Sequence, residues 1–339
     1  MPDATRQWLR FCQLVVGTGG VGLQVLSTHT DGFRISFTVT KTIRHTPNTA
    51  NILIYNLHPR DEKKVLEEFE DVILVAGYQP RAIVAADLNA QGALRNPNQF
   101  GARVVFKGDI KRAFAWWDHS SGARVTEIQA ADGHKAYREA VVNETLAAGS
   151  TSEAEVDAAL RAMGATGGVT KGFVQVRAHA RGRAKVISGS ARQVLHAVAS
   201  DNAANWSIQD GALHLLPSTG VLPNEAVVVN ENTGMTDAPT ISDKGVQVKC
   251  KLNPQITING ALKLNNDNIK IQEKQLYANG PKVKPKTLVR LSSDGVYKVF
   301  MLTHKGDTRG PEWDTVAEMV AVGQPIPAKG SKKAVVRIG

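Results

Sequence analysis

The residues best suited to chemistry lie within one short stretch near the C-terminus, 304–313. It brings together a histidine, two carboxylates and an arginine. A histidine that a carboxylate orients can act as a general base, so the stretch would form a hydrolytic site if Asp307 oriented His304. The stretch also lies between two expected strands, and its glycines and Pro311 are typical of a tight loop. We therefore interpret it as a connecting loop, and keep a hydrolytic site as the alternative.

A glycine pattern near the N-terminus, Gly17-x-Gly19-x-x-Gly22, has the spacing of a dinucleotide-binding loop. That loop needs a following helix, whose N-terminus holds the pyrophosphate. Apolar, strand-like segments at 9–16 and 21–26 flank the glycines instead. The pattern therefore predicts a hairpin with a glycine turn.

Other signatures of catalytic and metal sites are missing from the sequence. It contains no zinc-protease helix motif, phosphate loop, Gly-x-Ser-x-Gly elbow or paired-cysteine site, and its nine histidines are dispersed. We expect no catalytic residues, no cofactor-binding residues, no metal site and no cofactor.

The two cysteines, Cys12 and Cys250, lie far apart, each in an apolar, strand-like run. This indicates neither a disulfide framework nor a cysteine metal site, and we expect both thiols to stay reduced. The sequence has no run of about 18 apolar residues and no basic-then-apolar start. We therefore expect neither membrane insertion nor secretion by a cleaved peptide.

The net charge of +10 suggests a polyanionic partner, such as nucleic acid. The basic residues are scattered, however, and the only dense tracts, 282–286 and 329–337, have no aromatic residues between them. No nucleic-acid-binding module is recognisable. A dedicated nucleic-acid-binding function is therefore not favoured, although a channel protein that contacts DNA remains a third alternative.

The elements that would position these residues are mostly strands. Apolar and polar residues alternate over 33–40 and 50–55, which is the period of half-buried strands. A helix should follow from Pro59, with its buried side formed by Val65, Leu66 and Phe69. Further strands are expected at 71–77, at 103–110 with Val104, Phe106 and Gly108 on one face, from Arg112 to His119, and at 125–130. The long connection 78–101 is either an insertion that carries contacts or a mobile loop.

The middle of the chain has a different character. A capping box of Ser152 and Glu155 should start a helix that ends at Gly164, with Val156, Leu160 and Met163 at helical spacing. A second helix should start at Ser190, with Val194, Leu195 and Val198 facing inward. A hairpin with a turn at 209–211 should follow it. Strands then return at 246–252, 261–264, 297–303 and 315–322.

These elements predict an α+β, β-rich fold with four regions. The regions are 1–131, a β domain; 132–239, a smaller α+β domain; 240–323, a second β domain; and 324–339, a basic tail. The tail has two prolines and charges of one sign, so we expect it to be disordered or to order against a partner.

Several short motifs, in a fixed order along the chain, resemble those of baseplate hub proteins of contractile-tailed bacteriophages, the late control protein D-like family. The strongest is Gly295-Val296-Tyr297-Lys298-Val299 followed by His304-x-Gly306-Asp307-Thr308-Arg309-Gly310 and Glu312-Trp313. The others are Pro47-Asn48-Thr49-Ala50 to Asn56-Leu57, Ala76-Gly77-Tyr78, Phe106-Lys107-Gly108-Asp109-Ile110, Ala131-Asp132-Gly133, Gly149-Ser150-Thr151-Ser152 and Leu252-Asn253-Pro254. The resemblance extends to about Gly323, and segment 78–101 and the basic tail fit it less well.

The resemblance implies two tail-tube-like β-barrel domains with an intervening smaller α+β domain, assembled as a homotrimer. Such a ring would connect the tail tube protein above to the central spike protein below, beside other baseplate proteins of the virion. Phage DNA would pass through its channel without sequence-specific binding, and assembly would take place in the host cytoplasm. The alternatives are a tail-associated cell-wall hydrolase, whose site would be the 304–312 cluster, and another tube-like tail or baseplate protein.

Overall fold

The computed structural model describes residues 9–18, 21–28, 31–78, 101–177, 180–242, 245–265, 270–271 and 291–324. The interior of the predicted 78–101 connection, the basic tract 282–286 and the predicted tail beyond Gln324 lie outside the described residues.

One hydrogen-bonded sheet of 14 strands runs through most of the described chain, in the order β17-β14-β15-β19-β18-β3-β4-β7-β6-β5-β1-β2. Its first seven strands are β1 (Arg10–Thr18), β2 (Val21–Ser27), β3 (Ile35–Thr42), β4 (Thr49–Tyr55), β5 (Asp71–Tyr78), β6 (Arg103–Asp118) and β7 (Ala123–Ala131). The others are β14 (Thr240–Ser242), β15 (Gly245–Lys251), β17 (Lys270–Ile271), β18 (Val296–Asp307) and β19 (Trp313–Ala321), with β13 (Val227–Val228) and β16 (Ala261–Lys263) beside β18.

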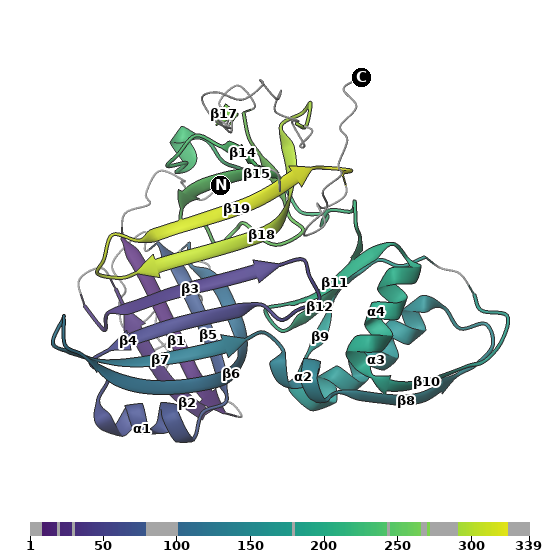
Figure 1. Ribbon diagram of the computed structural model, residues 1–339, viewed down its shortest axis with the longest axis horizontal. Helices are drawn as coiled ribbons and strands as arrows, with labels where there is room; N and C mark the ends of the chain where they lie inside the picture. The colour runs from purple at the N-terminus through teal and green to yellow at the C-terminus, as the bar shows by residue number, and fades with distance from the viewer. Residues whose placement is uncertain are drawn as a thin grey trace, which may run out of the picture.

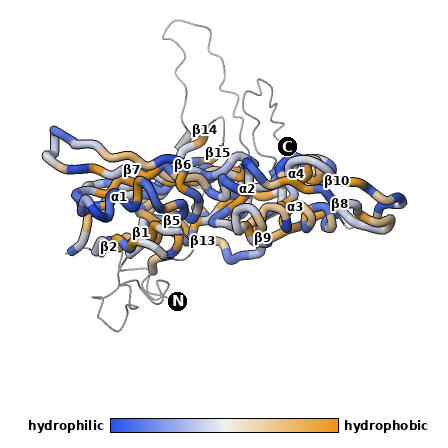
Figure 2. Tube along the Cα trace, turned by 90° about the horizontal axis from the view of Figure 1, so that it is seen from below, coloured by the Kyte–Doolittle hydropathy of each residue, from blue (hydrophilic) through white to orange (hydrophobic). Residues whose placement is uncertain are grey.

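Strands β1 to β7 curl around the first hydrophobic core. Strands β1, β2 and β5 cross behind β3, β4 and β7 in Figure 1, and Figure 2 shows β1, β2 and β5 on the side opposite β6 and β7. The inward residues of each strand alternate with outward ones, so Ile35, Phe37 and Val39 of β3 are all buried in this core. Leu252 and Trp313, from the distant C-terminal part, complete it.

Helix α1 (Pro59–Glu67) covers one end of the first core through Val65, but Leu66, predicted to be buried, is 38% exposed. The buried stripe of this short helix runs through Glu62 and Val65, and Leu66 falls at its margin. Glu62 can be buried because the Arg124 guanidinium lies 2.9 Å from its carboxylate.

Strand β6 is one strand of 16 residues, where the sequence suggested two segments. Its register with β5 shifts between Leu74 and Val75, because Val105 is an extra residue in a β-bulge. The prediction that Val104 and Phe106 share a face is therefore wrong: Phe106 is fully buried and Val104 is 41% exposed.

The middle of the chain forms a separate α+β unit around its own core, to the right in Figure 1. It contains a two-stranded sheet, β10-β8, and a three-stranded sheet, β11-β12-β9. Helices α3 and α4 pack on each other. Met163 of α3 and Leu195 of α4 are buried in this core. Its elements are α2 (His134–Glu139), β8 (Val141–Leu146), α3 (Ser152–Gly167), β9 (Thr170–Val174), β10 (Lys185–Ser190), α4 (Ala191–Asp201), β11 (Ala204–Gln209) and β12 (Ala212–Pro217).

The predicted start and end of α3 are wrong. The N-cap is Thr151, without a capping side-chain hydrogen bond, and the helix runs through Gly164 to Gly167. Glu155 cannot cap the helix because its buried carboxylate pairs with Arg181 and, at 2.7 Å, with Lys185. The predictions for α4 and for the β11–β12 hairpin are confirmed, with Asp210 and Gly211 at the positive φ angles that a tight hairpin turn requires.

Strands β14 to β19 surround a third core, which includes Val248, Leu262, Tyr297 and Met319. Strand β13 pairs with β16, so this short segment lies beside the C-terminal strands, close to a 3₁₀ turn (Glu231–Thr233). The chain is β-rich with few helices, as predicted. The domain boundaries and the number of closed barrels stay predictions. Among the described residues, no helix is long and apolar enough to span a membrane.

Candidate functional site

His304 and Asp307 do not form a catalytic pair. Both lie in β18, which continues to Asp307, so the loop predicted over 304–313 begins only at Thr308. Gly306 lies inside this strand, and a glycine is needed there because a Cβ would lie 2.4 Å from the ring of Phe37. Residues three apart on a strand point to opposite faces, and the two side chains therefore diverge.

The His304 imidazole is buried inside the sheet. Its Nδ1 lies 2.9 Å from Oγ1 of Thr315 on the neighbouring strand β19. Burial, and then the nearby positive charge of Lys41, lower the pKa of His304 to about 3. The ring is therefore neutral at physiological pH and is closed off from substrate, so its role is to fill and hydrogen-bond the core.

Asp307 organises the turn between β18 and β19. Its carboxylate accepts hydrogen bonds from Arg34 (2.7 Å), from the Arg309 backbone N–H (2.9 Å) and from the Gly310 backbone N–H (2.8 Å). Burial would raise the pKa of Asp307, but these hydrogen bonds outweigh it and hold the pKa below its ordinary value. Arg10 of β1 also donates to the backbone carbonyls of Asp307 (2.8 Å) and Gly310, so the turn is tied to the first core.

A second polar cluster joins the first core to the middle unit. The Asn48 amide donates to the Ile208 carbonyl at 2.8 Å and accepts from the Thr42 N–H at 2.8 Å. Asp132 accepts from the backbone N–H groups of Asp210 (2.6 Å) and Gly211 (3.0 Å). Two of the sequence motifs, 47–50 and 131–133, thus meet at this joint.

The charges at this joint are balanced by one buried lysine. Lys41 lies 2.7 Å from the Asp210 carboxylate. Asp132 is fully buried, and burial together with the negative charge of Asp210 raises its pKa to about 7. The motif residues therefore fasten parts of the molecule together, and they do not converge on a substrate.

The long sheet leaves one broad face turned away from all the cores, which we call the outward face. Near β6 it carries a patch of apolar side chains, and register pairs place Trp116 beside Val125 and Val125 beside Tyr55. The rings of Phe114 and Trp116 stack at 5.4 Å between centroids. We call this the aromatic patch, and its members are Leu53, Tyr55, Phe114, Trp116 and Val125.

Over β18, β19 and β15 the outward face is mainly polar and charged, with Met301 and Val316 as apolar members. On β18, β19 and β15 the outward positions alternate with buried ones, and Lys305 pairs in register with Asp314. Lys249 lies 3.2 Å from Asp314, also on this face. We call this part the charged half, and its members are Lys249, Lys251, Thr303, Lys305, Asp314 and Glu318.

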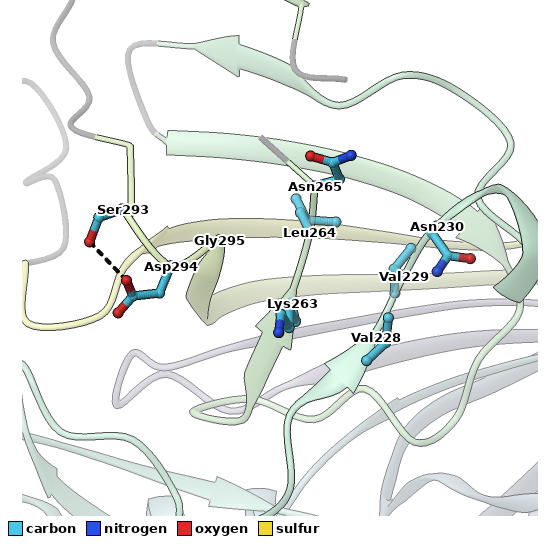
Figure 3. Close-up of a pocket in the computed structure, with 9 residues that line it drawn as sticks. All are labelled: Val228, Val229, Asn230, Lys263, Leu264, Asn265, Ser293, Asp294 and Gly295. Carbon is cyan, nitrogen blue, oxygen red and sulfur yellow. Dashed lines mark hydrogen bonds between the residues drawn. The ribbon is translucent and has the colours of Figure 1, made fainter. Parts of the chain in front are cut away.

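An open groove of about 480 Å³ lies between β13, β16 and the turn before β18 (Figure 3). Val228, Val229 and Leu264 give it apolar walls, while Lys263 and Asp294 lie at its sides. Asp294 accepts a hydrogen bond from Ser293, and no histidine or cysteine lines the groove. The described residues hold no group of three or more potential metal ligands.

The glycine pattern 17–22 lies in a hairpin, as predicted. Gly17 lies in β1 and Gly22 in β2, and these two residues pair with each other, so a strand and not a helix follows the described part of the pattern. A Cβ at Gly22 would lie 2.4 Å from the Val16 carbonyl oxygen, which explains that glycine by packing. Sequence reasoning missed the aromatic patch, although the alternation of Arg112, Phe114 and Trp116 indicates a shared face.

The family model described as Baseplate hub gp41 matches residues 19–268, which is most of the chain. No curated protein matches the sequence.

Two solved structures share the fold. The 43 kDa tail protein of prophage MuSo2 from Shewanella oneidensis superposes with a TM-score of 0.53 at 8% identity, covering 94% of this chain and 99% of that one. A tail protein from Neisseria meningitidis MC58 superposes with a TM-score of 0.52 at 9% identity, covering 91% of this chain and 96% of that one. At these identities the likeness concerns the fold alone.

Proposed function

The chain belongs to the Baseplate hub gp41 family, a family of phage tail structural proteins, and from this premise we propose that it is the central hub of a contractile tail. Three copies form a ring that connects the tail tube to the central spike. If each copy supplies two tube-like units, the ring has pseudo-sixfold symmetry and can match a sixfold tube above to a threefold spike below.

The observation that carries this proposal is the continuity of the sheet. Strand β3 of the first core pairs with β18 of the third over seven register pairs, from Ser36–Asp307 to Thr42–Met301. Two cores that share one sheet cannot rotate independently. A ring that transmits force between tube and spike requires this rigidity. Family membership and the fold of the two tail proteins support the same conclusion.

In this proposal the charged half of the outward face borders the channel. Asp314 lies between Lys305 and Lys251 and also pairs with Lys249, so the positive charge of this face is partly neutralised and phage DNA passes without tight or sequence-specific binding. The partners are two further copies, the tail tube protein, the central spike protein and other baseplate proteins. The protein is assembled in the host cytoplasm and is retained in the virion tail.

We also propose that the protein has no catalytic activity of its own, because the only candidate cluster is divided between two faces of β18. Peptidoglycan hydrolysis by the purified full chain measures this directly. Release of soluble fragments that disappears in both His304→Ala and Asp307→Ala, while Asp294→Ala remains active, would establish the hydrolase alternative.

Electron microscopy of the intact particle tests the hub proposal. We expect three copies in a ring between the tube and the spike. Six or more copies per particle, or density in the sheath or head, would refute it. A monomer in dilute solution is compatible with the proposal, because a hub can depend on its neighbours to assemble.

A further inference from the structure

Four basic side chains lie where the middle unit contacts the first unit, and we call them the basic cluster. Arg44 and His45 belong to the loop between β3 and β4, and Arg192 and His196 belong to α4. The rings of His45 and His196 are in edge-to-face contact, at 5.4 Å between centroids. Arg192 lies one helical turn before His196, so both side chains are on one side of α4. All four residues are exposed, so a solute can reach them.

Two aromatic rings connect the members of the basic cluster. The Trp206 ring lies 6.2 Å from the His45 ring and 6.2 Å from the Tyr137 ring. The Arg192 guanidinium lies 5.2 Å from the Tyr137 ring. These contacts limit the freedom of His45 and Arg192, so holding them against a ligand costs little additional conformational entropy. The buried Nε1 atom of Trp206 has no hydrogen-bond partner among the described residues, which is typical of a site that a further group completes.

The positive charge of the basic cluster has no acidic partner. Neither Arg44 nor Arg192 forms an ion pair with an acid in the described part of the chain. The first turn of α4 also contains no acid. Burial, and then the positive charges of His196 and Arg44, lower the pKa of His45. Basic groups that gather without a counter-charge favour the binding of an anion.

The acids of the same joint are occupied elsewhere. The Asp210 carboxylate lies 2.7 Å from Lys41, and Asp132 accepts hydrogen bonds from the backbone N–H groups of Asp210 and Gly211. Neither acid is among the groups that shift the pKa of His45. The counter-charge for the basic cluster therefore has to come from outside the described part of the chain.

We propose that the basic cluster binds a small doubly charged oxyanion, phosphate or sulfate, between the β3–β4 loop and α4. Guanidinium groups bind such oxyanions through charge-assisted hydrogen bonds, and protonated imidazoles donate hydrogen bonds from both ring nitrogens. The bound anion contacts one loop of the first unit and one helix of the middle unit, so it holds the two units in a fixed orientation. This inference goes beyond the hub function and does not depend on it.

Binding should strengthen as the pH falls. A bound anion favours the protonated forms of His45 and His196, so the pKa of His45 rises on binding and the anion binds more tightly in acid. Sulfate is the better probe for this test, because its charge stays constant near neutral pH whereas that of phosphate changes.

Histidine side-chain NMR signals of the purified full chain measure the binding, while sulfate replaces chloride at constant ionic strength. The signals of His45 and His196 are assigned by their loss in His45→Gln and His196→Gln. We expect both signals to shift and to saturate. The dissociation constant should be about tenfold lower at about pH 5.5 than at about pH 8.

Substitutions in the basic cluster test which side chains hold the anion. Arg44→Gln and Arg192→Gln should each weaken sulfate binding about tenfold at about pH 5.5, because each removes a charged hydrogen-bond donor. The control is His119→Gln, which changes an exposed histidine in the turn between β6 and β7 and should leave the affinity unchanged. Circular dichroism should be the same in all three variants, because none of these side chains is buried.

Several outcomes would overturn the anion site. Shifts that do not saturate, equal affinities at the two pH values, or an unchanged affinity in both arginine variants would each do so. Binding of a short DNA duplex without binding of sulfate or phosphate would also overturn it, because the ligand would then be a polymer. Failure of the hub proposal in electron microscopy would leave these measurements unaffected.

Discussion

Asp132 should make the stability of the protein depend on pH. Its folded pKa of about 7 lies above the ordinary value of 3.8, so the folded state holds a proton that the unfolded state releases. Stability from this group is complete below pH 4 and is lost as the pH rises to 7. At about 1.4 kcal/mol per pKa unit, the loss is on the order of 4 kcal/mol at most.

The measurement compares wild type with Asp132→Asn, which cannot ionise. The free energy of unfolding of wild type minus that of the variant, from urea denaturation, should fall between pH 4 and 7 and be constant above pH 8. A difference that stays the same across this range would show that Asp132 ionises normally in the fold.

Asp307 should matter for stability through its hydrogen bonds. Asp307→Ala leaves two backbone N–H groups and the Arg34 guanidinium without their acceptor. We expect a loss of about 2–4 kcal/mol in the free energy of unfolding at pH 7. Asp294→Ala, in an exposed turn, is the control and should change it by less than about 0.5 kcal/mol. Equal effects of the two substitutions would contradict this role.

At the scale of elements, the seam between β3 and β18 depends on a glycine. A Cβ at position 306 would lie 2.4 Å from the Phe37 ring and 2.9 Å from the Trp313 ring. Those rings pack edge to face at 5.6 Å between centroids, so they cannot both move aside. We expect Gly306→Ala to destabilise the protein by about 1–3 kcal/mol and to alter the near-ultraviolet circular dichroism.

Gly182→Ala is the matched control, because a Cβ there meets no atom within 4 Å and its φ is not positive. It should leave the free energy of unfolding and the aromatic signal unchanged. If Gly306→Ala behaves in the same way, the close contact at the seam does not determine the packing.

Local patterns predicted the elements whose signals are contained in a short window. Helix α4 starts after Ser190, and the hairpins β1–β2 and β11–β12 lie where glycine turns separate apolar runs. The strands β8 and β10 were missed because they are short and expose Val141 and Val186 on their outer face, which breaks the alternation.

Long-range pairing could not be predicted in this way. Thr38 pairs with Lys305, and no local pattern states which strand edges meet. The interpretation of 304–313 as a loop has the same cause. A glycine such as Gly306 indicates a turn in a local pattern, and only the distant Phe37, which packs against it, explains a glycine within a strand. Local patterns also could not predict the bulge at Val105. One extra residue in a strand moves the side chains after it to the opposite face of the sheet.

At the scale of the whole molecule, the middle unit should fold alone and the first unit should not. Among the residues that the structure describes, the second core draws only on those between Ala136 and Leu215. The first core needs Leu252 and Trp313, and its strand β3 needs β18.

A fragment of residues 132–217 should therefore show helical circular dichroism and a cooperative thermal transition. A fragment of residues 9–131 should lack a cooperative transition and should aggregate, as its β3 edge is open. A stable, monomeric 9–131 fragment would mean that the shared sheet contributes little to the first core.

The pairing of β3 with β18 also determines when the protein can finish folding on the ribosome. Lys305 is synthesised 267 residues after Thr38 (305 − 38), which at about 5–20 residues per second takes roughly 13–53 s. Throughout that interval the nascent chain exposes the edge of β3. Ribosomes that follow one another on the same messenger therefore carry chains with the same open edge, side by side. Slower translation of the codons for the middle unit would prolong this exposure and raise the chance that two nascent chains pair with each other.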